Sequence, residues 1–425
     1  MRVGFEGVVR RHSWRACLSV LGLLAAATNA RAQGTTAPAA QTSGWRDGFF
    51  IQSDNGDYRL QVGALVQADG RFALGSHAET VAATDTFLIR RLRPYLRGRL
   101  ARNFEFFINP DFAGGMVVLQ DAYVDTVFSP AFRIRLGKTK TPFGMERIQP
   151  ASNLLFFERA LPTSVAPNRD VGIGVLGDIS GGVLTYQAGV LNGVADGLSG
   201  DVDGNDGKDL AGRFLVRPLL KHQSSPLRGL TVGIAGTWGH QEGAAALPTL
   251  RTASLFQQYF SYSGAVADGV RSRYSPQLSY YNEAFAGIVE YVHTGTAVRK
   301  GDVTGDIRLD SWQVAGSWML TGDAATDGTT AVRPRANFDF GAGHLGAFQV
   351  VARYHALKVD DRAFTLGFAA PDSSGKADAW TVGLNWYLTP NFKYVVNFER
   401  TVFDGDADGP RKPENALVVR GQASF

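Results

Sequence analysis

The chain has 425 residues, with 43 Lys and Arg against 39 Asp and Glu, and its single cysteine is Cys17. One cysteine excludes a disulfide framework and a cysteine-based metal site. Charges this close to balance argue against a nucleic-acid binder that is basic throughout.

Residues 1–32 have the three parts of a secretory signal peptide. An arginine-rich start precedes an apolar run from Ala16 to Ala27, and Ala30–Ala32 fits the small-x-small cleavage pattern. The run is too short to span a bilayer as a helix. Cleavage would leave 425 − 32 = 393 residues, with 43 − 5 = 38 basic and 39 − 1 = 38 acidic side chains. Residues 33–44 then form a short flexible tract.

From Tyr58 onward the sequence alternates with a period of two. Apolar residues alternate with Arg, Gln and Asp in residues 58–72, with Leu65 as an exception, and the same pattern occupies 132–136 and 381–399. This period indicates strands with one apolar and one polar face. Stretches rich in Gly and Asp separate the strands and indicate turns.

The last strand keeps the alternation up to Phe425, the final residue. A terminal aromatic on such a strand, behind a signal peptide, indicates an outer-membrane β-barrel. At about ten residues a strand, 16 strands take roughly 160 residues and leave the rest for long outer loops and short inner turns. We therefore predict an all-β fold over residues 45–425: a transmembrane antiparallel barrel of about 16 strands around a water-filled channel.

One segment, FLIRRLRPYLRGRL at 87–100, carries five arginines and no carboxylate. The parity of the strand puts Arg91, Arg93, Arg97 and Arg99 on one face, and Leu88, Leu92, Leu96 and Leu100 on the other. A charge that faces lipid costs about 2–4 kcal/mol near the membrane midplane, so we expect the arginines to face the lumen. Arg90 breaks the parity and is expected at a strand end or a bulge.

Other arginines can line the same interior, namely Arg59, Arg71, Arg133 and Arg135. Arginine suits phosphate-like anions because its planar guanidinium binds oxygens in pairs and stays charged. A solvated surface strand and a nucleic-acid-binding segment are the alternative interpretations of the arginine-rich segment. Asp69 and Glu105 fall on the lumen side too, and we expect them to weaken any preference for anions.

These stretches resemble the phosphate-selective porin O/P family of Gram-negative outer membranes. The matching stretches occur in order along nearly the whole mature chain: VQADGRF (66–72), FLIRRLRP (87–94), LQDAYVD (119–125), LGKTKTPFGMER (136–147), FFERALP (156–162), RDVGIGVLGD (169–178), NG (192–193), DVDGNDGKDLAGR (201–213), TVGLNWYLTP (381–390) and GQASF (421–425). The resemblance implies a 16-stranded barrel, usually a homotrimer, with one pore per subunit. It also implies a third outer loop that folds inward to form a constriction.

That loop would lie within residues 141–169 and would carry Arg147, Arg159 and Arg169 with Glu146 and Glu158. The family's adjacent arginine pair matches Arg90 and Arg91, which makes Arg90 a pore residue despite its parity. The chain departs from the phosphate-selective members at Leu65 and Ser152, where they have Arg and Lys. Their dense arginine ladder is reduced to Arg251, Arg271 and Arg273. We therefore expect a preference for anions more than strict phosphate selectivity.

The resulting hypothesis is an outer-membrane porin for passive diffusion of small anions, with phosphate or polyphosphate as candidate solutes. Its pore-lining set is Arg59, Arg71, Arg90, Arg91, Arg93, Arg97, Arg99, Arg133, Arg135, Arg147 and Arg159. We expect contact with outer-membrane lipid, and no catalysis, cofactor, metal or nucleic-acid partner.

Three alternatives stay open: a barrel enzyme of the lipase or protease type, a general non-selective porin, and a secreted carbohydrate-binding sandwich. No GxSxG motif occurs, and none of the six histidines after residue 32 lies in a recognisable catalytic motif. The acidic stretch 201–209 is similar to a calcium loop, but its twelfth position is Gly212 instead of the bidentate glutamate, which favours an acidic turn.

Overall fold

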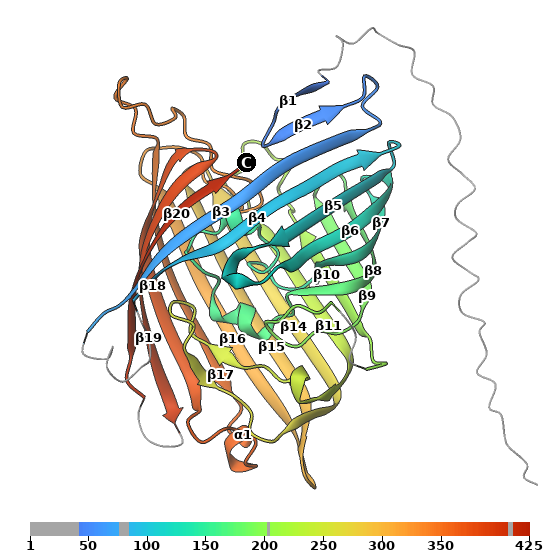
Figure 1. The fold of residues 1–425 in the computed structure, drawn as a ribbon, viewed down its shortest axis with the longest axis vertical. Coiled ribbons are helices and arrows are strands. Elements are labelled where there is room, and N and C mark those ends of the chain that lie inside the picture. The colour runs from blue at the N-terminus through green and yellow to red at the C-terminus, as the bar shows by residue number, and fades with distance from the viewer. Residues whose placement is uncertain (1–41, 76–84, 202–204, 407–410) are drawn as a thin grey trace, which may run out of the picture. The chain divides into compact units, whose positions relative to one another are not determined.

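A computed structural model describes residues 42–75, 85–201, 205–406 and 411–425 (Figure 1). The predicted signal peptide lies outside the described residues. Sixteen strands form a closed antiparallel barrel, in which each strand pairs with the next and β20 (Glu414–Ser424) pairs back with β3 (Arg59–Ala73). The predicted fold class is confirmed.

The remaining barrel strands follow in chain order. They are β4 (Thr86–Leu100), β5 (Phe104–Asp111), β6 (Val118–Ser129), β7 (Phe132–Lys140), β8 (Arg169–Ile179), β9 (Leu184–Leu191), β10 (Asp209–Val216), β11 (Thr231–Gly243), β14 (Val266–Asn282), β15 (Phe285–Lys300), β16 (Val303–Met319), β17 (Ala347–Val359), β18 (Ser374–Thr389) and β19 (Phe392–Asp406). Strands β5 to β10 have 8–12 residues, whereas β14 to β19 have 13–17. The barrel wall is therefore low at β5 to β10, which we call the low wall, and high at β14 to β19, which we call the high wall.

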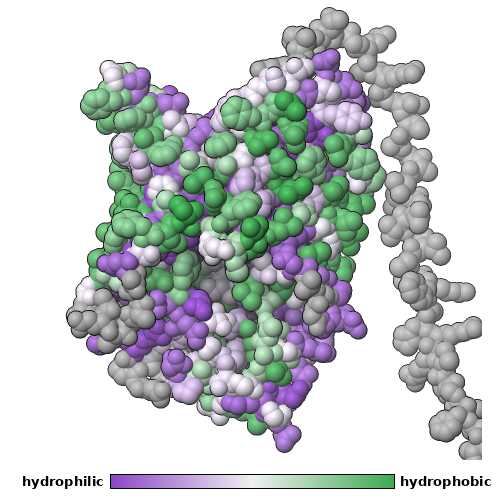
Figure 2. All heavy atoms as spheres, in the orientation of Figure 1, coloured by the Kyte–Doolittle hydropathy of each residue, from purple (hydrophilic) through white to green (hydrophobic). Residues whose placement is uncertain are grey.

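The outward faces of the strands are apolar, as the period of two predicts. Leu92 is 39 % exposed and Leu136 is 63 % exposed, and Figure 2 shows hydrophobic residues across the face in view, with hydrophilic residues toward the lower end. The apolar side chains on this surface can contact lipid, so no charged side chain has to enter the hydrocarbon part of the membrane. Among the described residues, no helix is long and apolar enough to cross a membrane.

Phe425 lies at one end of the closing seam. Its N–H and C=O pair with the backbone of Ala64 at 3.0 and 2.8 Å. Next to it, β1 (Ser43–Trp45) and β2 (Phe49–Gln52) form a hairpin that extends the edge of β3. The expected domain start at residue 45 falls within β1. We call the barrel end that holds Phe425 the inner end and the opposite end the outer end.

The loop between β7 and β8, residues 141–168, lies inside the barrel. It contains two 3-10 turns, η3 (Ala151–Asn153) and η4 (Leu161–Val165). The N–H of Phe157 donates to Asn397 Oδ1 at 2.9 Å, and Lys393 Nζ donates to the carbonyl of Leu154 at 3.0 Å. Because Asn397 and Lys393 belong to β19, the loop crosses the lumen to the high wall. The predicted constriction loop is confirmed.

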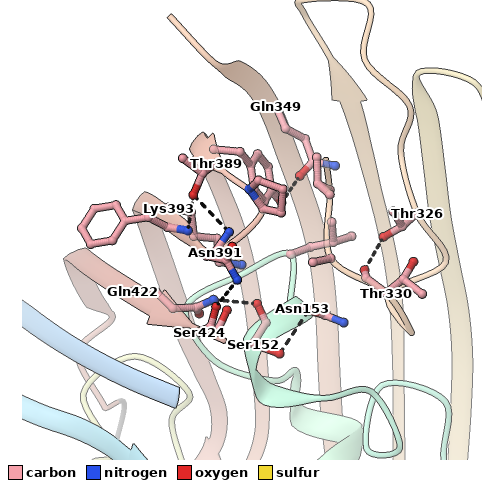
Figure 3. A pocket seen from close by; sticks show the side chains of 16 residues that line it. Ser152, Asn153, Thr326, Thr330, Gln349, Thr389, Asn391, Lys393, Gln422 and Ser424 are labelled. Carbon is pink, nitrogen blue, oxygen red and sulfur yellow. Dashed lines mark hydrogen bonds between the residues drawn. The ribbon is translucent and has the colours of Figure 1, made fainter. Parts of the chain in front are cut away.

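The expectation of short inner turns is wrong at residues 320–346. This connection between β16 and β17 has 27 residues at the inner end. Val332 packs in a buried cluster with Met319 and Tyr387, and Arg333 pairs with Asp47 at 2.9 Å. Figure 3 shows Thr326 and Thr330 lining one pocket with Ser152 and Asn153 of the constriction loop. Part of the connection thus lies against that loop.

Apolar residues fill the outer end beside the high wall. Here η5 (Ala244–Ala246), β12 (Leu250–Arg251), β13 (Gln258–Phe260) and α1 (Arg362–Thr365) lie between barrel strands, while η2 (Ala113–Gly115) follows β5. Leu250, Phe260 and Phe368 pack with lumen-facing Val298, Ile307 and Leu357. Two cavities remain on the opposite side of the lumen.

Candidate functional site

A bulge in β4 determines where its arginines point. Arg91 pairs with Gln67 and Ile89 pairs with Ala68, so Arg90 has no partner across the strands. The extra residue brings Arg90 to the same side as Arg91, as the resemblance implies. It also reverses the parity before the bulge: Leu88 lies opposite the lumen-facing Asp69, while Phe87 is 82 % exposed on the outside. The prediction that Leu88 faces lipid is therefore wrong.

Four arginines surround Glu158 of the constriction loop. Arg90 Nε lies 2.5 Å and Arg91 Nη2 lies 2.9 Å from its carboxylate oxygens. Arg71 and Arg420 approach the same carboxylate at 3.2 and 3.3 Å, and both also pair with Asp69. We call these six side chains the constriction cluster. Four cations against two carboxylates leave an excess of two positive charges.

The carboxylate of Glu158 stays ionised because of these neighbours. Burial alone would raise the pKa of Glu158, but the four guanidinium groups together hold its pKa well below the usual range. Removal of one partner from such a buried group costs several kcal/mol when nothing replaces it. The cluster therefore ties the loop to β3, β4 and β20.

The two arginines within the loop have a different environment. Arg159 donates to the carbonyls of Glu146 and Gln149 at 3.1 and 2.6 Å, and Arg147 donates to the carbonyl of Thr163. The structure places these predicted pore-lining side chains in the internal hydrogen bonding of the loop, where they hold its backbone in shape.

Two cavities follow the inner face of the low wall. One has a volume of about 580 Å³ and is lined by Arg46, Arg59, Arg97, Arg99, Arg133 and Arg135. The other has a volume of about 310 Å³, and Arg93, Arg135, Lys140 and Arg169 line it together with Ser152 of the constriction loop. Phe107, Tyr123 and Arg135 line both cavities. The two cavities together form a candidate permeation pathway.

The lining of this pathway is positive. Its cations are Arg46, Arg59, Arg93, Arg97, Arg99, Arg133, Arg135, Lys140 and Arg169, and its carboxylates are Asp47, Glu105, Asp121 and Asp125. Nine cations less four carboxylates leave an excess of five positive charges. A positive surface around water raises the local concentration of anions and lowers that of cations.

Ion pairs offset part of this charge. Arg99 and Arg133 flank Glu105 at 3.2 and 3.3 Å, and Arg135 binds both carboxylate oxygens of Asp125 at 2.7 Å. Arg93 lies 2.7 Å from Asp111. In the part of the chain that the structure describes, Arg59 and Arg97 have no carboxylate within ion-pair distance.

Arg271 and Arg273 are buried instead of lining the pathway. Arg273 pairs with Asp196 at 2.6 Å and with Asp209 at 3.1 Å, and Arg271 lies 3.4 Å from Asp209. The last aspartate of the acidic stretch 201–209 thus accepts hydrogen bonds from guanidinium groups, while Asp203 lies outside the described residues. The described residues contain no group of three or more His, Cys, Asp or Glu arranged to hold a metal.

Sequence reasoning missed Arg420 and Lys140 as site residues. Arg420 lies on the polar face of an alternating strand, so parity was the available signal for it, whereas Lys140 has the parity of the apolar residues Ile134 and Leu136 and donates to carbonyls of the constriction loop. Neither lies in an arginine-rich segment, and only the folded loop brings Arg420 to Glu158.

The family described as phosphate-selective porin O and P matches residues 60–422. The chain belongs to this family. By family and by fold it is an outer-membrane porin. An uncharacterized protein of Caulobacter vibrioides is 24 % identical over 348 residues, which are 75 % of this porin and 63 % of that relative.

Two solved structures show the same fold. The outer-membrane channel DcaP of Acinetobacter baumannii has a TM-score of 0.59 at 10 % identity, over 88 % of this porin and 99 % of that chain. The anion-selective porin from Comamonas acidovorans has a TM-score of 0.51 at 12 % identity, over 87 % and 100 %.

Proposed function

We propose that this porin allows passive diffusion of small anions, including inorganic phosphate, along the low wall of its barrel. The observation that carries the proposal is the excess of positive charge in the lining, where nine cations face four carboxylates. Guanidinium groups bind the oxygens of phosphate and carboxylate in pairs, so an anion can exchange water for arginine as it moves. Several cations are spaced along the wall and provide more than one weak anion-binding site. Conduction requires such weak, multiple sites because an ion must be able to leave each of them.

The proposed route starts in the larger cavity at the inner end and continues into the cavity beside the constriction loop. Arg59, Arg97 and Arg99 act in the first part, and Arg93, Lys140 and Arg169 act in the second. Arg71, Arg90 and Arg91 act through the constriction cluster, where they position the loop and leave residual positive charge. Arg133 contributes in the first part, and Arg135 contributes where the two cavities meet.

A general porin with weak selectivity is the second candidate. The ion pairs of Arg93, Arg99, Arg133 and Arg135 favour it, because each carboxylate cancels part of the field that an anion would meet.

The proposal includes no catalytic step. A barrel hydrolase would need a nucleophile in reach of a base. His355 lies 3.4 Å from Glu399 but is fully buried, and its Nδ1 accepts the N–H of Leu161, so this pair supports the loop. Assays of lipid and peptide hydrolysis by the purified porin test this part, and activity above a heat-denatured control would contradict it.

We further propose export by the signal peptide at residues 1–32 and assembly as a homotrimer. The low wall supports trimer formation, since its outward face is apolar at Ile108, Val124 and Ile173. Chemical cross-linking in native outer membranes should yield a trimer band, and a monomer band alone would contradict the trimer.

The decisive test of anion passage is the reversal potential of single channels in asymmetric KCl. We expect the sign that corresponds to preference for Cl⁻ over K⁺, and addition of phosphate should lower the Cl⁻ current. A cation preference would reject the proposal, and equal passage of both ions would favour the general porin.

A further inference from the structure

Three aromatic side chains lie in a row on the lumen face of strands β4, β5 and β6. The ring centroid of Phe107 on β5 is 5.8 Å from that of Tyr95 on β4 and 5.7 Å from that of Tyr123 on β6. All three rings are half-buried. We call Tyr95, Phe107 and Tyr123 the aromatic band. Lipid contact does not account for it, because the outward faces of these strands carry other residues, among them Leu96 and Ile108.

The aromatic band lies where the two cavities meet. Phe107 and Tyr123 line both cavities, and Tyr95 lines the one beside the constriction loop. A solute that passes from one cavity to the other therefore moves over these rings.

One arginine, Arg97, lies directly beside the band. Arg97 pairs with Phe107 across strands β4 and β5, and its guanidinium carbon lies 5.5 Å from the ring centroid of Tyr95. Side chains directly opposite each other on neighbouring strands are close enough to act on one ligand. In contrast, Arg135 stacks on Tyr123 at 3.7 Å and already binds Asp125. Among the described residues, no carboxylate lies within ion-pair distance of Arg97.

A glycine, Gly63, leaves space for the side chain of Tyr95 in the aromatic band. A Cβ atom at Gly63, opposite Tyr95, would lie 2.2 Å from the hydroxyl of that tyrosine. Glycine lets Tyr95 cross the strand and donate its hydroxyl hydrogen to the carbonyl of Phe425 at 2.9 Å. This hydrogen bond holds one end of the band in place.

We infer that the aromatic band and Arg97 form a subsite for small aromatic carboxylates. The flat ring of the ligand stacks against Phe107, and its carboxylate accepts paired hydrogen bonds from Arg97. Offset or tilted contact with a second ring adds binding that an aliphatic ring of similar size does not gain. The inference rests on the proposed anion channel and names a class of solute for it.

The test compares benzoate with cyclohexanecarboxylate as blockers of the Cl⁻ current through single channels at neutral pH. Both are carboxylates with a six-membered ring, and only benzoate is aromatic. We expect benzoate to block at a concentration about two- to tenfold lower. The substitution Phe107→Leu should bring the ratio of the two blocking concentrations to about one. Arg97→Gln should weaken block by both acids.

Phe104→Leu is the matched control, since Phe104 lies on the outward face of the same strand and is 45 % exposed. It should retain the preference for benzoate. Equal block of the wild-type channel by both acids, or a preference that Phe107→Leu leaves unchanged, would overturn the subsite. Reversal potentials in KCl from the same channels separate the two proposals. An anion-preferring channel with equal block rejects the subsite alone, whereas a cation-preferring channel rejects the proposed function.

Discussion

At the residue scale, neighbouring positions of β4 have opposite environments, one inside the barrel and one on its outer surface. Arg91 is 2 % exposed, contacts Glu158 at 2.9 Å and donates to Gln67 at 2.6 Å, while the next residue, Leu92, is 39 % exposed on the outside. A guanidinium needs hydrogen-bond acceptors and a leucine side chain does not. Substitutions that change the polarity at Arg91 and at Leu92 therefore test which face meets the lumen and which face meets lipid.

Leu92→Arg is expected to hinder assembly. An arginine near the middle of a strand on the lipid face costs about 2–4 kcal/mol. Heat-modifiable gel mobility measures the folded fraction, and Leu92→Met provides the control for a change of shape without charge. Normal folding of the arginine variant would mean that this face does not meet lipid.

Arg91→Ala is expected to leave the barrel folded and to lower its anion preference. Glu158 keeps three other guanidinium partners, so the loop stays anchored while the excess of positive charge in the constriction cluster falls from two to one. The reversal potential in asymmetric KCl measures the change. An unchanged potential would exclude the constriction cluster from control of selectivity.

Glu158 also predicts how the channel responds to acid. Because its folded pKa is held well below 4.5, its contribution to loop anchoring is complete above the usual pKa of glutamate. That contribution is lost only as the pH falls through the depressed folded value. Single-channel conductance should therefore show a Glu158-dependent change below about pH 4.5. Glu158→Gln should remove this acidic change, and an acidic change that persists in Glu158→Gln would contradict this assignment.

At the element scale, two connections enter the lumen from opposite ends. The constriction loop crosses from the outer end, and part of the 320–346 connection meets it from the inner end. Gln149 of the loop donates to the carbonyl of Asp327 at 3.4 Å, and Asp327 lies 3.6 Å from Arg217. Ala325 and Val332 at the two ends of this part pack in the buried cluster with Met319 and Tyr387, while Thr326 and Thr330 between them line a pocket with the constriction loop.

Replacement of residues 326–331 by a shorter Gly-Ser linker is expected to raise the single-channel conductance, because it removes side chains that lie beside the constriction loop and keeps the buried Ala325 and Val332. A matched replacement of residues 340–343 should have no effect, since Phe340 at this turn is 86 % exposed. Equal conductance in both variants and wild type would place the connection outside the ion route.

At the scale of the whole molecule, the barrel depends on one closing seam between β20 and β3. Phe425 extends the seam by two backbone hydrogen bonds and accepts a third from Tyr95, and its ring lies 5.6 Å from that of Trp45. Each such hydrogen bond contributes about 1 kcal/mol net. An open edge within lipid would leave backbone groups without partners, so closure is required for insertion.

Deletion of Phe425 is therefore expected to impair assembly. The fraction of heat-modifiable barrel in isolated outer membranes measures the effect, and Phe425→Tyr should assemble normally because it keeps the backbone and the aromatic ring. Full accumulation of the folded barrel without residue 425 would contradict this prediction.

The sequence alone predicted the barrel, its 16 strands and the lumen side of Arg91, Arg93, Arg97 and Arg99. A period of two together with the cost of charge in lipid is enough for the barrel and for the lumen side of these arginines, whereas the number of strands came from the chain length and the family resemblance. Placement on the lumen side is a local property of a strand and does not require knowledge of its neighbours.

The tertiary structure decided which arginines are paired and where the open space lies. Arg420 meets Glu158 across 262 positions of the chain, and Arg147 and Arg159 turn to carbonyls of their own loop. The bulge that brings Arg90 inward and turns Leu88 away from lipid is visible only in the register with β3. Ion pairing, bulges and cavities depend on distances between segments far apart in the chain, and a periodic pattern carries no such distances.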